Sequence, residues 1–258
     1  MEFNNKVALI TGGTSGIGLS VAASLAQKGA KVVVVGRNSS KGEEAIQELK
    51  QIHSDVVFLS KDVSQSSEIK QMVDETLSIF GTLDFAFNNA CHAEMTPART
   101  HEFSEEDFDR MMGITIKSVW LCMKYELQAM LKGGGGSIVN TSSLDAFVCH
   151  PGITAYTVGK SGIITLSKCV AREYGKQGIR VNTLTPGAIR TPMIERKFEG
   201  LSKEEGNMLE EKYQNINALG RMGTPEEAAN VVTWLMSEKS SYITGQNIIL
   251  DGGVSYIS

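Results

Sequence analysis

The sequence predicts an α/β fold: a single doubly wound parallel sheet of seven strands with helices on both faces. Two observations carry this prediction. Short, mainly apolar runs alternate along the chain with longer segments of helical periodicity. Most of these runs lack the polar alternation of a half-exposed strand, which is typical of strands that helices cover on both sides.

The apolar runs give the expected strands, and the amphipathic segments between them give the expected helices. The strands are expected at Val7–Ile10, Lys31–Val35, Val56–Leu59, Leu83–Phe87, Ser137–Asn140, Arg180–Leu184 and Asn247–Leu250. The helices are expected at Ile17–Lys28, Lys41–Ile52, Ser67–Phe80, Glu105–Leu131, Tyr156–Gly175 and Pro225–Ser237.

The composition describes one domain with a large core. The chain has 258 residues, 41% of them hydrophobic, so a single α/β domain over 1–258 is expected. Its net charge of −4 gives no basis for binding nucleic acid or an anionic membrane surface. No apolar run approaches the roughly 18 residues needed to span a bilayer. The chain begins with a short polar stretch rather than a signal peptide, so a cytoplasmic location is expected.

The four cysteines indicate reduced thiols rather than disulfides or a metal centre. Cys91, Cys122, Cys149 and Cys169 form no CxxC pair and no metal-ligand spacing with the four histidines. We therefore expect no bound metal. Cys122 and Cys169 lie in apolar helical runs, which predicts that both are buried in the core.

One segment interrupts the alternation of strands and helices. Residues 190–223 carry an apolar stripe among many charges, including Met193 and Phe198. An insertion beside the strand ends of an open α/β sheet is well placed to cover a substrate. The segment is expected to form a small helical substrate lid. A surface helical hairpin that packs on its own domain or on a neighbour is the alternative.

A glycine-rich turn, residues 11–18, links the first strand to the first helix. Its glycines let the backbone approach a pyrophosphate, which then lies at the positive end of the helix dipole. In this strand–turn–helix context the turn predicts a Rossmann-like dinucleotide site. The residues expected to bind the cofactor there are Gly12, Thr14, Ser15, Gly16, Ile17 and Gly18.

The end of the second strand indicates which dinucleotide binds. NAD-specific sites usually carry a carboxylate here that accepts hydrogen bonds from the ribose hydroxyls. This chain instead has Gly36 followed by Arg37, whose guanidinium can pair with a 2′-phosphate. We therefore predict NADP as the cofactor, with NAD as the alternative. Asp62 and Val63 are expected to face the adenine, although a solvated carboxylate at Asp62 fits the sequence equally well.

Tyr156 and Lys160 are four residues apart in an expected helix, so their side chains lie on one face. The pKa of a free phenol is near 10, and a neighbouring ammonium group lowers it by favouring the phenolate. Ser143 follows a strand, where its hydroxyl can hold a carbonyl or alcohol oxygen, whereas Ser142 points the other way. The Tyr–Lys pair alone also fits a solvated helix face; the glycine turn makes chemistry the better interpretation.

Together these motifs resemble those of the short-chain dehydrogenase/reductase family, in the branch that includes 3-oxoacyl-carrier-protein reductases. The resemblance runs nearly from end to end of the chain. It rests on residues 11–18, Asp62-Val63, Asn88-Asn89-Ala90, Ser143, Tyr156–Lys160, Pro186-Gly187, residues 242–246 and Asp251-Gly252-Gly253.

The resemblance implies a role for each motif residue. Tyr156 would be the general acid or base, Lys160 would lower its pKa and hold the nicotinamide ribose, and Ser143 would orient the substrate oxygen. It also implies a homotetramer built through residues 105–131, residues 156–175 and the C-terminal segment. The remaining residues implied at the cofactor are Asn89, Ala90, Pro186, Gly187, Ile189 and Thr191.

Two residues depart from the family pattern. The family's Asn-Asn-Ala-Gly ends here in Cys91, which places a side chain close to the cofactor. The family also carries a catalytic asparagine in the long helix, where it helps to hold a water for proton relay, and the aligned residue here is Thr115. A threonine hydroxyl donates and accepts but lacks the geometry of an amide. Thr115 is assigned the fourth catalytic role, and the proton relay through it is therefore expected to be rerouted or slowed.

The substrate is expected to be a small, partly apolar ketone or secondary alcohol. Carrier-protein reductases tend to carry basic residues around positions equivalent to 133–136 and 175–178, where this chain has little charge. A free small molecule is therefore favoured. His150 and Met193 are candidates to touch it. His150 and His92 are expected near the pocket mouth, with ordinary loop histidines as the alternative.

The sequence therefore predicts an NAD(P)-dependent oxidoreductase that transfers a hydride between a nicotinamide and a ketone/alcohol pair. Two alternatives stay open. One is a non-redox enzyme of the same fold, such as a dehydratase or isomerase. The other is a catalytically silent cofactor-binding protein, for which Thr115 and Cys91 are the arguments.

Overall fold

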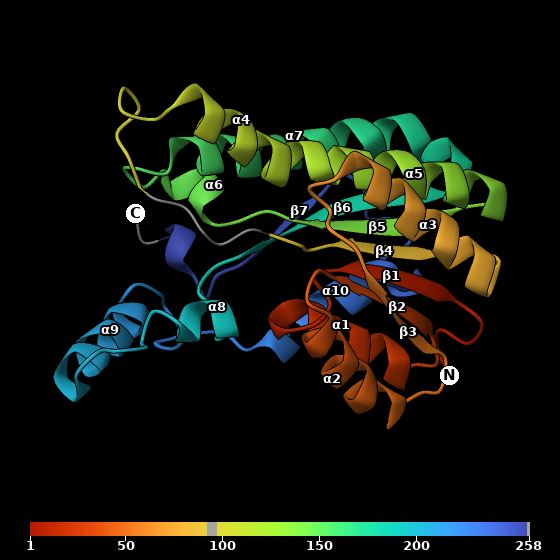
Figure 1. Ribbon diagram of the computed structural model, residues 1–258, viewed down its shortest axis with the longest axis horizontal. Coiled ribbons are helices and arrows are strands. Elements are labelled where there is room, and N and C mark those ends of the chain that lie inside the picture. The colour runs from red at the N-terminus through yellow and green to blue at the C-terminus, as the bar shows by residue number, and fades with distance from the viewer. Residues whose placement is uncertain (92–96, 257–258) are drawn as a thin grey trace.

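The computed structural model describes residues 1–91 and 97–256, and its centre is a parallel sheet of seven strands (Figure 1). The strand order is β3-β2-β1-β4-β5-β6-β7, which confirms the predicted doubly wound fold. The order reverses between β1 and β4, so their carboxyl ends form the switch point where ligands bind in such sheets. The strands are β1 (Val7–Thr11), β2 (Lys31–Gly36), β3 (Val56–Ser60), β4 (Phe85–Asn88), β5 (Gly136–Thr141), β6 (Ile179–Pro186) and β7 (Asn247–Leu250).

Helices cover both faces of the sheet (Figure 1). On one face lie α1 (Gly16–Gln27), α2 (Ser39–Lys50) and α10 (Pro225–Met236), and on the other lie α3 (Ser66–Phe80), α5 (Ser118–Gly133) and α7 (Thr154–Tyr174). Helix α10 begins with a capping box between Thr224 and Glu227 and has proline at its first position.

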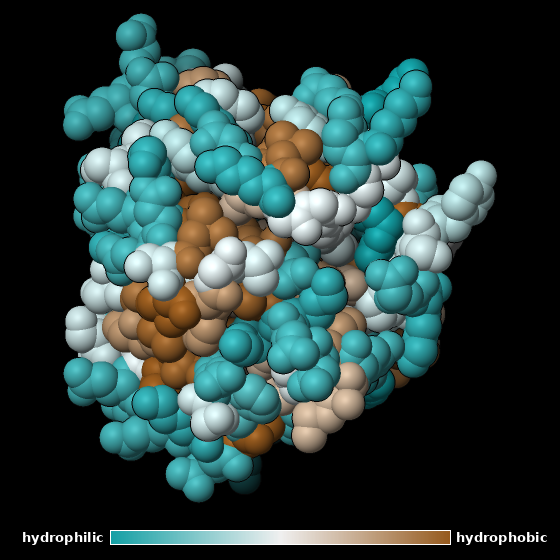
Figure 2. Space-filling view, turned by 90° about the vertical axis from the view of Figure 1, so that its right-hand side faces the viewer, coloured by the Kyte–Doolittle hydropathy of each residue, from teal (hydrophilic) through white to brown (hydrophobic). Residues whose placement is uncertain are grey.

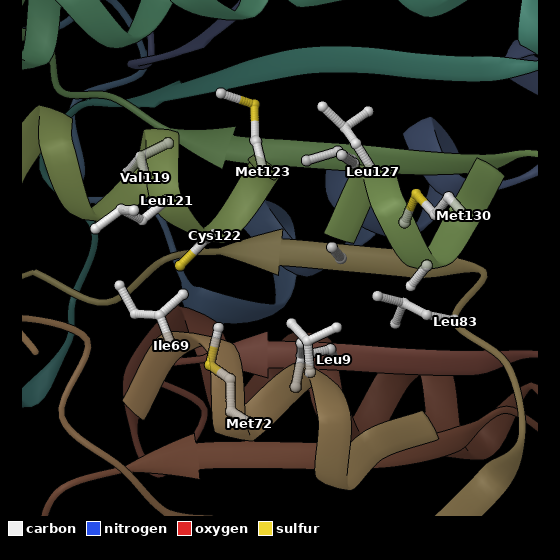
Figure 3. Close-up of a cluster of buried hydrophobic side chains, with 14 of the residues drawn as sticks. Leu9, Ile69, Met72, Leu83, Val119, Leu121, Cys122, Met123, Leu127 and Met130 are labelled. Atoms are coloured by element: carbon white, nitrogen blue, oxygen red, sulfur yellow. The ribbon is translucent and has the colours of Figure 1, made fainter. Parts of the chain in front are cut away.

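The core consists of two apolar layers, one on each side of the sheet. Figure 3 shows the layer in which side chains of α3 and α5 meet the strands. Leu9, Ile69, Met72, Met123 and Met130 are each at most 1% exposed there. Because such interiors are close-packed, the strand ends that carry the candidate site are fixed relative to one another.

The expected helix 105–131 is interrupted. It consists of α4 (Glu105–Met112), a π-helical turn over Gly113–Lys117 and then α5. Thr115 lies inside this turn, is buried, and packs against Gly159 of α7. π turns inside helices are often found at functional sites, and this one contains Thr115, the residue expected from the sequence to take the place of the family's asparagine.

Three shorter helices lie beside the carboxyl ends of the strands. Helix α6 (Asp145–Val148) follows β5 and was not predicted. Helices α8 (Pro192–Glu195) and α9 (Lys203–Asn215) belong to the 190–223 segment and project from the rest of the molecule (Figure 1). Both ends of this segment meet at a β-bridge between Ile189 and Gly223.

The cysteine prediction is half right. Cys122 is buried on α5, as expected. Cys169 is exposed on α7, so the prediction that it fills the core is wrong. The apolar run around it shows helical periodicity, but its position falls on the outer side of the helix.

Several large hydrophobic side chains remain on the surface. Trp120 on α5 and Val158 on α7 are each 45% exposed, and Trp234 on α10 and Tyr242 before β7 are also exposed. Figure 2 shows the end of the molecule away from α8 and α9, where hydrophilic residues surround a hydrophobic band. In the described part of the chain, no helix combines the length and apolarity that crossing a membrane requires.

Candidate active site

The glycine turn lies against the end of β4 with almost no spare room. A Cβ atom on Gly12 would lie 2.9 Å from the Cα of Ala90, and one on Gly18 would overlap the carbonyl oxygen of Gly12. Gly12 also has φ = +64°, in the left-handed region that favours glycine. Only a turn without side chains at these positions lets the two backbones approach so closely.

Asn89 fastens the turn to β4 through its amide group. Its Nδ2 donates to the carbonyl oxygen of Gly12 at 3.3 Å, and its backbone N–H donates to Thr11 Oγ1 at 3.1 Å. Asn89 Oδ1 accepts a hydrogen bond from Thr141 at 3.5 Å. Asn89 therefore ties together the ends of β1, β4 and β5, whichever ligand the turn holds.

The N-terminus of α1 opens directly from this turn. Ser15 is the N-cap residue, and its side chain makes no capping hydrogen bond. The first turn of α1 carries no acidic residue. The free N–H groups at a helix start favour an anion, and a carboxylate there would oppose one. The turn therefore has the chemistry of a pyrophosphate site.

The residues expected at the adenosine end lie at the ends of β2 and β3. Arg37 follows β2, is more than half exposed, and lies 3.8 Å from a carboxylate oxygen of Asp62. Val63 packs against the core beside Asp62. Gly36 leaves room for Thr14, because a Cβ there would come within 2.9 Å of the Thr14 methyl group. The end of β2 therefore carries Gly36 followed by the positive side chain of Arg37, and no carboxylate of its own.

The residues expected around the nicotinamide follow β6. Pro186 pairs with Leu250 on β7, and the N–H of Gly187 donates to the Leu250 carbonyl at 2.9 Å. Ile189 is 5% exposed. The Thr191 side chain lies 3.1 Å from the Cβ position of Gly16, so this segment closes over the glycine turn.

Tyr156 and Lys160 lie one turn apart near the start of α7, with the Lys160 Nζ 5.7 Å from the Tyr156 ring centroid. Lys160 is 3% exposed, and its Nζ donates to the carbonyl oxygen of Thr141 at 3.0 Å. This bond orients the ammonium group at the end of β5. The two side chains share one face of the helix, as their spacing predicts.

The pKa of Tyr156 differs from the expectation. Burial raises it well above the ordinary value for a phenol, the charges of Cys91 and Asp145 raise it further, and the hydrogen bond with Ser143 lowers it. We expect from the sequence that Lys160 lowers this pKa, but the net shift in this structure is upward, because desolvation of the phenolate is its largest cause. The Lys160 ammonium group donates to Thr141.

The two serines after β5 have separate partners. The Ser142 hydroxyl is buried and donates to the carbonyl oxygen of Lys160 at 2.8 Å. The Ser143 hydroxyl instead interacts with Tyr156 and donates to Asp145 Oδ2 at 3.2 Å. Of the two, Ser143 is the serine beside the phenol.

Thr115 does not direct its hydroxyl into the site. Its Oγ1 donates to the carbonyl oxygen of Met111 at 2.7 Å, within the same helix. The side chain fills the space beside Gly159, where a Cβ would overlap it. Its hydrogen is directed at Met111 and its side chain packs beside Gly159, so a part for Thr115 in proton relay stays a prediction.

A buried polar cluster beneath the site was not predicted. Asn88 Nδ2 donates to Glu126 Oε2 and to Asn140 Oδ1, both at 2.9 Å, and Asn140 Nδ2 donates to Ser167 at 2.9 Å. Burial raises the pKa of Glu126 to about 8. The sequence does hold a signal, because Glu126 lies four residues after Cys122 and four before Met130, on the core side of α5.

The substrate candidates lie on two different segments, the loop after α6 and the start of α8. His150 Nδ1 lies 2.8 Å from Asp145 Oδ1, and Met193 is 42% exposed at the start of α8. His92 lies outside the described residues. A cavity of about 350 Å³ adjoins the first turn of α7, lined among others by Phe103, Phe108 and Thr154. Its lining includes neither Ser143 nor Tyr156. Among the described residues, no cluster of three or more histidine, cysteine or acidic side chains suits a metal.

Comparison with known proteins places this geometry in a family. A family model described as "Enoyl-(Acyl carrier protein) reductase" matches residues 12–255. The cyclohexanol dehydrogenase of Acinetobacter sp. (strain SE19) is 37% identical over 251 residues, which cover 97% of this chain and 95% of that protein.

Two further relatives match over almost their whole length. The 2,5-dichloro-2,5-cyclohexadiene-1,4-diol dehydrogenase of Sphingobium indicum is 37% identical, with 99% of each chain covered. The crystal structure of levodione reductase superimposes with a TM-score of 0.92 at 33% identity, covering 99% of this chain and 100% of that one. The chain therefore belongs to the short-chain dehydrogenase/reductase family and is an oxidoreductase acting on the CH–OH/C=O pair with a nicotinamide cofactor.

Proposed function

We propose that this protein is an NADP-dependent oxidoreductase that interconverts a small cyclic secondary alcohol and its ketone, with Tyr156 as the general acid and base. One observation carries the proposal. A buried phenol that interacts with Ser143 lies on the same helix face as the buried ammonium group of Lys160. Both belong to α7, beside the strand ends that hold the glycine turn.

The residues present fit a dinucleotide. Gly12 and Gly18 have no room for a Cβ atom, so the glycine turn packs its backbone directly against the end of β4 and the start of α1. Ser15 and the free N–H groups of α1 would hold the pyrophosphate, and Arg37 would pair with a 2′-phosphate. Lys160 would hold the nicotinamide ribose. When bound, the nicotinamide supplies the hydride acceptor or donor.

The proton chemistry belongs to this chain's own side chains. In the reductive direction, Tyr156 Oη–H donates its proton to the oxygen of the carbonyl, and Ser143 Oγ–H donates a hydrogen bond to the same oxygen. In the oxidative direction, the Tyr156 phenolate accepts the alcohol proton. Burial favours the neutral phenol, so the oxidative direction needs a phenolate stabilised by positive charge, and Lys160 is the cation nearest on α7.

The relatives support a cyclic substrate. Two of them are named as dehydrogenases of cyclohexanol and of a cyclohexadienediol. In this chain Met193 and the Phe198–Tyr213 ring pair lie in the 190–223 segment, whose ends meet at the Ile189–Gly223 bridge after β6. We propose that this segment is the substrate lid of one domain and that it selects a partly apolar ring.

A panel of cyclic alcohols and ketones, followed by NADPH absorbance, tests the reaction. We expect turnover with at least one pair. Tyr156→Phe should reduce kcat by at least about 100-fold, the contribution typical of a positioned general acid, while nucleotide binding stays close to the wild type. Turnover retained by Tyr156→Phe would contradict the role of the phenol. Cofactor binding without any turnover would favour a non-redox enzyme or a silent binding protein.

The cofactor preference is tested by comparing NADPH with NADH in the wild type and in Arg37→Ala. A charge-assisted hydrogen bond to a phosphate contributes about 1.5–3 kcal/mol, so we expect the KM for NADPH to rise about 10- to 100-fold. The KM for NADH, which has no 2′-phosphate, is the internal control and should change little. A wild-type preference for NADH would overturn the assignment.

We also propose a homotetramer. The exposed Trp120 and Val158 lie on α5 and α7, and the exposed Trp234, Tyr242 and Ile249 lie on α10, before β7 and on β7. Side chains of this size on two separate surfaces support two kinds of subunit contact. Light scattering of the wild type should give four chains, and Trp120→Glu should reduce that to two. A monomeric wild type would contradict the proposal.

A further inference from the structure

A line of polar contacts leads from solvent to the candidate catalytic phenol. His150 Nδ1 lies 2.8 Å from Asp145 Oδ1, and the other oxygen of that carboxylate, Oδ2, accepts a hydrogen bond from Ser143 Oγ at 3.2 Å. Ser143 in turn interacts with Tyr156. The imidazole is mostly exposed and the carboxylate is about one-third exposed, so the outer end of the line is in contact with solvent.

The local fold brings these groups together. Asp145 starts the short helix α6, and its backbone N–H donates to Ser143 Oγ at 3.2 Å. Ser161 of α7 donates to the carbonyl oxygen of Ala146 at 3.0 Å, which fixes α6 against the catalytic helix. Cys149 then adopts a left-handed conformation with φ = 55°, so the chain turns back and returns His150 to Asp145.

The Ser143 hydroxyl has a single proton to give. A serine hydroxyl donates one hydrogen bond and accepts up to two. In this structure the donor is directed at Asp145 Oδ2, and one acceptor position takes the Asp145 N–H. To orient a substrate oxygen, Ser143 must turn the same proton away from the carboxylate. Asp145 therefore competes with the substrate for that proton.

We propose that Asp145 and His150 are positioning residues for the reaction at Tyr156: the Asp145 carboxylate holds the Ser143 proton and favours a protonated phenol, and the His150 imidazolium weakens that hold. The proposal rests on the proposed function of Tyr156. A positive charge on one carboxylate oxygen withdraws charge from the other, so a protonated His150 releases Ser143 toward the substrate oxygen.

Other titratable groups also lie against the Tyr156 phenol, and they act on its pKa independently of the Asp145–His150 pair. Lys160 on the same helix and Cys91 after β4 are the titratable groups that the described structure places against Tyr156 from elsewhere. The carboxylate of Asp145 and the thiol of Cys91 both raise the pKa of Tyr156 in addition to burial. Histidine is the side chain whose charge ordinarily changes between pH 5 and 8.

The test is the pH profile of alcohol oxidation in three variants. Asp145→Asn keeps the shape but removes the charge, and should raise kcat/KM at pH 7 about tenfold, since one charge beside a phenol shifts its acidity by about one unit. His150→Gln should lower kcat/KM about threefold at pH 5.5 and leave it unchanged at pH 9, because glutamine carries no charge at either pH. In Asp145→Asn/His150→Gln, the second change should have no further effect.

The proposal predicts that Asp145→Asn raises kcat/KM and that His150→Gln lowers it, and this difference separates it from a structural role. If the pair only stabilised the loop, both single variants would lower the rate at every pH, and that outcome would overturn the proposal. His101 lies 3.8 Å from Glu102 and is also exposed, so His101→Gln is the matched control and should leave the profile unchanged. Asp145→Glu restores the charge and should return the rate at pH 7 toward the wild type.

A second measurement does not need turnover. Nitrogen-15 NMR of the imidazole, assigned with His150→Gln, should show the proton on Nδ1 at pH 8.5 in the wild type and a loss of that preference in Asp145→Asn. If the His150 tautomer is the same in the wild type and in Asp145→Asn, the proposed Asp145–His150 interaction is wrong, even if the enzyme is active. A wild type that oxidises no alcohol would overturn the proposed function, and the ring-nitrogen result would still decide whether the pair exists.

Discussion

The candidate site has a nucleotide side, formed by the glycine turn and the strand ends, and a second side formed by the 190–223 segment. Different kinds of contact hold these two sides. The glycine turn and the ends of β1, β4 and β5 are joined by close backbone packing and buried hydrogen bonds, with Asn88 and Asn140 at most 3% exposed. The 190–223 segment is joined by exposed charges. Arg190 reaches Glu195 at 2.8 Å and Glu210 at 2.6 Å, and α9 buries no residue.

This difference separates the conditions to which each side responds. Buried groups sense pH through protonation but are little affected by salt, whereas exposed ion pairs are screened by salt and contribute little to stability. The nucleotide side is therefore expected to be rigid, and the 190–223 segment to rearrange easily. A dehydrogenase needs both properties, because the cofactor must be held still while the substrate enters and leaves.

The largest expected effect tests the buried side through Glu126. The pKa of Glu126 is raised from 4.5 to about 8. Between these two pH values the folded protein keeps a proton that the unfolded chain has already released. Stability should therefore be highest below pH 4.5 with respect to this group, and fall between pH 4.5 and 8. The slope approaches about 1.4 kcal/mol per pH unit.

Glu126→Gln removes that titration and should flatten this part of the profile. Urea unfolding at pH 5, 6.5 and 8 measures the slope in both proteins. Glu75 on α3 is exposed, so Glu75→Gln is the control and should keep the wild-type slope. Equal slopes in the wild type and Glu126→Gln would mean that the carboxyl is ionised when buried.

A smaller effect is expected when one glycine on each side of the site is replaced by alanine. In Gly18→Ala the new Cβ overlaps the Gly12 carbonyl oxygen and lies 2.9 Å from the Asn89 amide nitrogen. Overpacking costs about 1–3 kcal/mol, so nucleotide binding should weaken about 10- to 100-fold, as measured by calorimetric titration. In Gly206→Ala on α9 nothing lies within 4 Å, so binding should stay the same and the helix should gain up to about 1 kcal/mol. Equal effects of the two changes would remove the contrast between the two sides.

The smallest effect concerns Arg190. Arg190→Met keeps an unbranched side chain but removes the bonds to Glu195 and Glu210. Because these groups are exposed, the free energy of unfolding should change by less than about 1 kcal/mol. The KM for the substrate should rise about threefold at low salt, and the wild type in 1 M salt should approach the variant. If neither salt nor the substitution changes the KM, the ion pairs of Arg190 do not hold the 190–223 segment in place.

Much of the fold followed from local pattern. The expected strands Val7–Ile10 and Asn247–Leu250 agree with β1 and β7 to within one residue. β1 is buried along its whole length, and such a strand has to be apolar on both faces. The π-helical turn at Thr115 and helix α6 were missed. Both arise from packing against α7, which periodicity along one segment does not register.

The candidate site was predicted unevenly. The glycine turn and the Tyr156–Lys160 spacing are sequence patterns whose geometry is nearly fixed by the helix and the turn themselves. The Asp145–His150 pair and the cluster around Glu126 depend on which distant segments meet, and neither has a motif. The upward direction of the Tyr156 pKa shift was also not predicted, since desolvation is a property of the folded surroundings rather than of the neighbouring residue.

By itself, the order of residues determined the parallel sheet, the nucleotide turn at its switch point and the helix face that presents a phenol with a lysine. These depend on periodicity and backbone freedom, which act over a few residues. Only the tertiary structure decided which hydrogen-bond partners Ser143, Lys160 and Thr115 take, and how strongly the phenol holds its proton. The reason is physical: burial and hydrogen-bond competition are set by groups from several strands and helices at once.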